Sequence, residues 1–199
     1  MIGRLSLAGI AIRRGGRQLF AGVSLELGAG EACALTGPNG AGKTSLLRAI
    51  AGLVRIETGE IGFGDVETEA ARAEGLHFQG HLDGLKPART AREELDFWSR
   101  WAGAGPAGTR AAVAALDLEP LLDLEVRRLS AGQRRRLALA RLLAAPRPLW
   151  LLDEPLSPLD AGWRARFGEL MRDHLRGGGL ILAAVHDPLP VATKALELA

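Results

Sequence analysis

The chain has 199 residues, a formal net charge of +2 at pH 7 and one cysteine. This length suits a single domain of ordinary size with a full hydrophobic core. The near balance of charge argues against a protein that coats nucleic acid, so we expect no nucleic-acid partner. Cys33 has no partner for an internal disulfide and lies in an apolar run, so we expect it to be a core residue.

No stretch of the chain is apolar for long enough to cross a membrane. The run from Leu180 to Val185 is far shorter than the roughly 20 residues that a spanning helix needs. Met1 to Phe20 contains scattered arginines and no apolar block of the kind found in secretory signals. We therefore expect the protein to remain in the cytosol.

The amino-terminal part predicts strands followed by a helix. Leu5 to Leu27 alternates loosely between apolar and polar residues and is broken by Gly15-Gly16 and Gly22, which predicts short antiparallel strands. The apolar run Glu31 to Thr36 is typical of a buried strand. Apolar residues then recur at helical spacing up to about Gly52, and these are Leu46, Leu47, Ile50 and Leu53.

The segment between this strand and this helix has the pattern G-x-x-x-x-G-K-[ST] of a phosphate-binding loop. Its glycines let the backbone wrap around a polyphosphate, and the positive end of the next helix attracts the phosphate oxygens. Lys43 is expected to reach the β and γ phosphates, and the Thr44 hydroxyl to ligate Mg²⁺. The residues expected to bind ATP here are Gly37, Pro38, Asn39, Gly40, Ala41, Gly42, Lys43, Thr44 and Ser45.

The middle of the chain is predicted to be largely helical. Thr58 to Asp65 contains a turn and a short strand, and Leu76 to Gln79 is a further strand candidate. Helical spacing runs from Thr90 to about Leu129, with a loop before a second helix that begins near Thr109. Trp98 and Trp101 within this part favour core packing over a partner-docking face.

Two continuous apolar runs near the carboxyl end, Leu149 to Leu152 and Leu180 to Val185, predict buried parallel strands. We therefore predict an α/β fold in which a mostly parallel sheet carries an antiparallel β subdomain and an inserted helical subdomain. The strand before the phosphate loop and these two strands all end in polar residues. Ligands bind at the carboxyl ends of parallel strands, so the three ends are expected to face one nucleotide.

Carboxylates follow the first of these two strands. Asp153 is expected to hold Mg²⁺ or its water opposite Thr44. Glu154 is expected to orient or deprotonate the attacking water. A second motif is Leu129 to Gln133, in which Ser130 suits a helix N-cap and opens a helix that favours an anion.

The order of these motifs resembles the ATP-binding cassette family of ATPases. The resemblance rests on the segments GPNGAGKT, LSAGQ and LLDEP and on the later His186. The resemblance implies a head-to-tail dimer that sandwiches ATP, in which Ser130, Gly132 and Gln133 complete the site of the other subunit. It also implies that Ser157 to Asp160 crosses the dimer interface and that His186 senses the γ phosphate. The family fold implies one domain over 1–199, with a helical subdomain at about 82–145.

Two positions depart from the family pattern. The place of the usual adenine-stacking aromatic falls at or near Arg14, whose planar guanidinium is able to stack on a base. The glutamine that the family uses near the nucleotide and its Mg²⁺ corresponds to Gln79, or to His81 in an ungapped comparison.

A narrower resemblance, carried by Phe78 to Leu95 and Arg14 to Phe20, is to the ATPase subunit of the bacterial haem exporter for cytochrome c maturation. It implies integral membrane partners, a place on the cytoplasmic face of the inner membrane, and a role in release or export of haem or a haem chaperone. Other readings are an exporter of unrelated cargo, a non-transport clamp and a small-molecule kinase. The kinase reading leaves LSAGQ and His186 unexplained.

Overall fold

The computed structural model describes residues 1–198. Its backbone divides into two compact units. The sheet unit contains residues 1–78 and 147–155 and the chain from 165 onward, and the helical unit contains residues 79–146 and 156–164. The range expected for the helical subdomain, about 82–145, lies inside the helical unit. The single-domain organisation itself stays a prediction.

An antiparallel sheet of order β2-β1-β4 begins the sheet unit. Its strands are β1 (Arg4–Arg14), β2 (Arg17–Gly28) and β4 (Thr58–Gly62). The predicted hairpin at Gly15-Gly16 is confirmed, but the expectation of short strands broken at Gly22 is wrong. Gly22 lies inside β2 with a positive φ of 73°, between register pairs Ile10↔Val23 and Ile12↔Phe20, where the pairing shifts. The glycine absorbs an irregularity of the ladder, so the strand continues through it.

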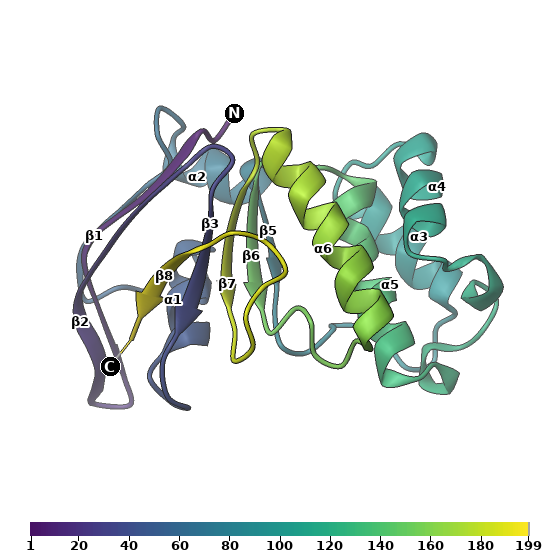
Figure 1. The fold of residues 1–199 in the computed structure, drawn as a ribbon, viewed down its shortest axis with the longest axis horizontal. Coiled ribbons are helices and arrows are strands. Elements are labelled where there is room, and N and C mark those ends of the chain that lie inside the picture. Colours follow the sequence, from purple (N-terminus) through teal and green to yellow (C-terminus); the bar gives the residue numbers. More distant parts are fainter. Residues whose placement is uncertain (199) are drawn as a thin grey trace. The chain divides into compact units, whose positions relative to one another are not determined.

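The second sheet is parallel and has the order β5-β6-β7-β3-β8 (Figure 1). Its strands are β3 (Ala32–Thr36), β5 (Leu76–Gln79), β6 (Leu149–Asp153), β7 (Leu180–Ala184) and β8 (Lys194–Glu197). Every residue of β6 and β7 is buried, which confirms the prediction from their continuous apolar sequences. Strand β8 was not predicted from the sequence, because an edge strand with mostly exposed residues carries no apolar run.

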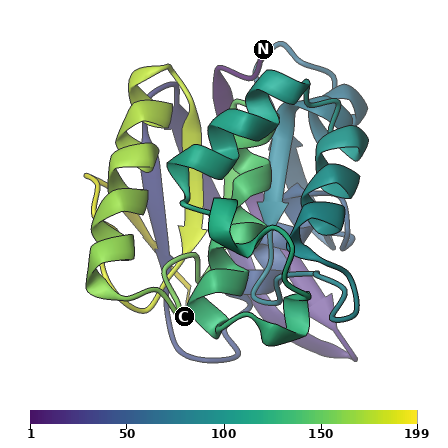
Figure 2. The ribbon, with the colours of Figure 1, turned by 90° about the vertical axis from the view of Figure 1, so that its right-hand side faces the viewer.

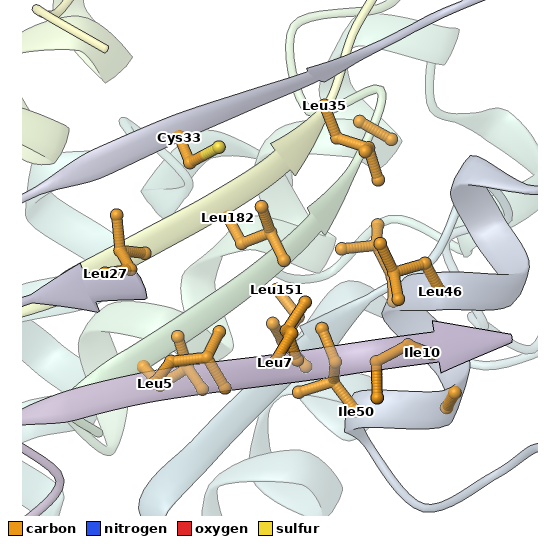
Figure 3. Packing of buried hydrophobic residues seen from close by; sticks show 14 of the residues in the cluster. Leu5, Leu7, Ile10, Leu27, Cys33, Leu35, Leu46, Ile50, Leu151 and Leu182 are labelled. Carbon is orange, nitrogen blue, oxygen red and sulfur yellow. The ribbon is translucent and has the colours of Figure 1, made fainter. Parts of the chain in front are cut away.

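Side chains cover both faces of the parallel sheet. On one face α1 (Lys43–Ile50) packs with residues of β1, β3, β6 and β7 in a single buried cluster, where Leu46 and Ile50 lie near Leu7 and Ile10 (Figure 3). Cys33 is in this cluster and is fully buried, as expected for a core residue, and burial raises the pKa of its thiol to about 11. On the other face the ring of Trp150 stacks on Phe167 of α6 (Ala161–Arg176) at 6.3 Å. In the sequence between β4 and β5 the chain also forms α2 (Thr68–Ala70) and the π-helical turn η1 (Ala71–Gly75).

The helical unit contains three principal helices, coloured teal to green in Figure 2. They are α3 (Ala91–Trp101), α4 (Pro106–Ala115) and α5 (Ala131–Ala144), with the 3₁₀ turns η2 (Glu119–Leu121) and η3 (Val126–Arg128) before α5. The predicted start of α4 near Thr109 is three residues late, because Pro106 occupies the first helical turn, where proline is favoured.

The expected core packing of Trp101 is wrong. Trp101 is 68% exposed, because the last buried residue of α3 is Ser99 and Trp101 ends the helix beyond it. Its ring packs edge-to-face on Trp98 at 5.6 Å. Throughout residues 1–198, no helix combines the length and the apolar character needed to cross a membrane.

Candidate functional site

Three neighbouring strand ends form the base of the candidate site. In the parallel register Leu35 of β3 pairs with Ala184 of β7, and Ala184 pairs with Asp153 of β6. The carboxyl ends of the three strands therefore lie side by side, as the sequence predicts. The phosphate loop leaves β3 and enters α1 at this edge.

Three glycines of the loop, Gly37, Gly40 and Gly42, have positive φ values that other residues rarely adopt. Gly42 is the N-cap of α1 and has a φ of 101°. No side chain caps this helix, and its first turn contains no acidic residue. The amino end of α1 thus keeps its donors and its partial positive charge for an anion. A Cβ on Gly42 would lie 2.7 Å from the ring of Phe20, and a Cβ on Gly37 would lie 2.2 Å from the Leu198 carbonyl oxygen. Phe20 and Leu198 thus support the loop, and the sequence analysis identified neither.

Lys43 lies inside the loop. Its ammonium donates hydrogen bonds to the carbonyl oxygens of Gly37 at 2.6 Å and of Pro38 at 3.2 Å. The side chain is held across the loop and the residue is only 8% exposed. Pro38, Asn39 and Gly40 form the exposed outer side of the loop, whereas Ala41 and Ser45 are buried.

Thr44 and Asp153 come together although they are far apart in sequence. The Thr44 hydroxyl donates to Asp153 Oδ2 at 2.9 Å, and Asp153 is 3% exposed. A hydroxyl and a carboxylate are hard oxygen ligands of the kind that Mg²⁺ prefers. This pair fits the metal expected from the sequence.

Glu154 and His186 also meet at this edge. The Glu154 backbone has φ of 51°, and its N–H donates to the Ala184 carbonyl oxygen at 2.9 Å. This bond continues the ladder between β6 and β7 while the chain turns away. His186 Nε2 lies 3.5 Å from Glu154 Oε1. The structure therefore places a carboxylate and an imidazole together directly after two buried strands.

Arg14 lies at the exposed end of the β1–β2 hairpin, where it pairs with Arg17. Its contact with adenine stays a prediction.

The remaining candidates belong to the helical unit. Ser130 caps α5 as predicted, since its hydroxyl accepts from the Gln133 N–H at 3.2 Å and the Gln133 side chain accepts from the Ser130 N–H at 2.8 Å. This is a complete capping box. A Cβ on Gly132 would lie 3.6 Å from the Pro158 carbonyl oxygen, so the start of α5 and the Ser157 to Asp160 segment are neighbours.

Gln79 is fully buried at the end of β5. Its side-chain oxygen accepts from Nε of Arg141 at 3.1 Å and from Nη2 of the same guanidinium. His81, the alternative candidate, is exposed, and its carbonyl oxygen accepts from Arg135 at 3.0 Å. Neither arginine was predicted from the sequence, although charged residues inside the apolar pattern of α5 were a usable signal.

The loop, the Thr44–Asp153 pair and the parallel sheet define a nucleotide-binding protein of the phosphate-loop class. A family model described as ABC transporter matches residues 20–157. The protein described as "Cytochrome c biogenesis ATP-binding export protein CcmA" of Nitrobacter winogradskyi is 50% identical over 195 residues, covering 98% of each chain. The protein of the same description from Bradyrhizobium diazoefficiens is 47% identical, covering 93% of this chain and 92% of its own. The chain belongs to the ABC transporter family and is an ATPase of that family.

Solved structures agree with this assignment at the level of the fold. An ABC transporter ATP-binding protein from Pyrococcus furiosus superimposes with a TM-score of 0.85 at 19% identity, covering 98% of this chain and 97% of its own. A bacterial Atm1-family ABC exporter with ATP bound gives 0.84 at 23% identity, with 99% of this chain but 37% of the exporter covered.

Proposed function

We propose that this chain is the ATP-hydrolysing subunit of a bacterial export complex for c-type cytochrome biogenesis, which powers release or export of haem or a haem chaperone. The observation that carries the proposal is the 50% identity to a cytochrome c biogenesis export protein across 98% of both chains. The phosphate loop supplies the nucleotide chemistry that such a subunit needs.

Within the sheet unit each residue has a role that fits its contacts. Lys43 exchanges the loop carbonyls for the β and γ phosphates of ATP. Thr44 and Asp153 would hold Mg²⁺, which would neutralise charge at the phosphates. Glu154 accepts a proton from the attacking water, and His186 beside it senses the γ phosphate. Arg14 stacks on adenine.

The helical unit contributes the residues that act across subunits. We propose that Ser130, Gly132 and Gln133 at the start of α5 contact the nucleotide of a second copy in a head-to-tail dimer. The amino end of a capped helix offers backbone donors to an anion, which supports this role. Gln79 would act within its own subunit, where its amide oxygen would serve as a ligand of Mg²⁺.

The same proposal assigns the chain to the cytoplasmic face of the inner membrane, where it binds integral membrane subunits of the complex. Its docking surface is the region 90–129 with the loop before it. Trp101 and Leu82, both exposed, are apolar side chains available in this part of the chain.

The test is genetic complementation with the Lys43→Ala variant as the only copy. We expect covalently attached, haem-stained cytochrome c to disappear while the variant protein accumulates normally and other membrane transport continues. Unchanged haem staining would discard the cytochrome assignment and leave an ABC exporter ATPase of unrelated cargo.

A further inference from the structure

The Gln79 amide oxygen is hydrogen-bonded to an arginine within the helical unit. This oxygen accepts from two donors of the same Arg141 guanidinium, Nε at 3.1 Å and Nη2. The Gln79 amide nitrogen donates to the Gly80 carbonyl oxygen at 3.1 Å. In this arrangement the one side-chain atom of Gln79 that can bind a cation is occupied by another cation.

Several contacts hold Arg141 in place. Its guanidinium lies 5.0 Å from the centre of the Trp98 ring, a cation–π contact. Its Nη2 also faces the Asp83 carbonyl oxygen at 3.4 Å. Burial lowers the pKa of Arg141 to about 10, which leaves the group charged at neutral pH. The Arg141 guanidinium thus has the Gln79 amide oxygen as its principal hydrogen-bond acceptor, and the charge of Asp83 also stabilises it.

We propose that Arg141 is a positioning residue that competes with Mg²⁺ for the Gln79 amide oxygen. The inference rests on the proposed role of Gln79 as a metal ligand. When only a fraction of the protein is in the conformation that binds a ligand, the apparent affinity for that ligand is reduced by the same fraction. The Arg141–Gln79 pair therefore weakens Mg²⁺·ATP binding, and its rupture is part of forming the ATP-bound state.

The first measurement needs no nucleotide. Urea unfolding in EDTA of wild type, Arg141→Met, Gln79→Met and the double variant gives the coupling between the two side chains. A hydrogen-bonded pair that includes a charge predicts a non-additive change in the unfolding constant of about tenfold or more. Additive changes would overturn the pairing.

The second measurement is equilibrium binding of trinitrophenyl-ATP with Mg²⁺ and, separately, with EDTA. We expect Arg141→Met to bind up to about tenfold more tightly than wild type with Mg²⁺ and equally in EDTA. Gln79→Met in the same background should abolish the gain. General damage to the fold would alter binding in both conditions.

The matched control is Arg136→Met, which removes another buried arginine of α5. Arg136 donates to the Leu116 carbonyl oxygen at 2.9 Å, and its guanidinium lies 4.1 Å from the centre of the Trp163 ring. We expect the Arg136→Met substitution to leave the binding constants with Mg²⁺ and in EDTA unchanged. If Arg141→Met does not fold, Arg141→Lys keeps the charge but loses the two-donor fork, and it should show a smaller gain of the same sign.

A folded Arg141 variant without a Mg²⁺-dependent gain overturns the inference. If wild-type protein binds Mg²⁺·ATP no better than Lys43→Ala does, the proposed function is overturned instead. Failure of the inference and failure of the proposed function therefore give different results.

Discussion

Glu154 can be tested by a substitution that keeps its shape and removes only its charge. We expect Glu154→Gln to bind ATP normally and to hydrolyse it about 10²–10⁴-fold more slowly, because the group that accepts the proton from water is lost. ATP should then accumulate between two copies, and size-exclusion chromatography with Mg²⁺·ATP should show a dimer. Hydrolysis at the wild-type rate would remove Glu154 from the mechanism.

The sequence indicates the residues of the site more readily than their supports. Motif spacing identified Thr44 and Asp153, and the structure joins them at 2.9 Å. It did not identify Phe20 or Leu198, which lie against the loop glycines, because nothing in a local pattern shows which distant residue fills the space beside a glycine. The Arg141 contact with Gln79 was also missed, although arginines inside the apolar pattern of α5 were a usable signal.

Helix α5 has a serine at its start that serves both as a cap and, in our proposal, as a phosphate contact. The Ser130→Asp and Ser130→Ala substitutions separate these roles. Aspartate caps as well as serine does, whereas alanine costs about 1 kcal/mol of stability. We therefore expect Ser130→Asp to keep the melting temperature of wild type, yet to abolish hydrolysis because its charge repels the γ phosphate. An active, stable Ser130→Asp variant would reduce Ser130 to a cap.

Among whole elements, those with strong periodicity or long apolar runs were predicted well, and those without were not. The strands β6 and β7 followed directly from uninterrupted apolar sequence. The strand β8 did not, since its four residues include Lys194 and Glu197 and are largely exposed. Its place beside β3 is decided by pairing with a distant strand, which no local pattern encodes.

At the scale of the molecule, an exposed aromatic side chain marks the expected contact with membrane partners. Trp101 is 68% exposed at the end of α3. We expect Trp101→Ser to lower retention of the protein on membranes that contain its partner subunits by about tenfold, without changing ATP binding, because large aromatic residues often dominate interface energies. Sedimentation of membranes followed by immunoblotting measures this.

The control for that experiment is Leu53→Ser, which removes a similarly exposed apolar residue, 65% exposed, from the sheet unit. Equal loss of retention in the two variants would point to a general effect of surface polarity and not to docking through α3.

The contact between Leu198 and the phosphate loop also affects how the protein is best attached to a surface for binding measurements. Because Leu198 lies against Gly37, we expect a load applied next to Leu198 to disturb the phosphate loop. Met1, in contrast, is fully exposed. We therefore expect nucleotide binding to be weaker when the protein is held on a biosensor through the chain next to Leu198 than when it is held through Met1.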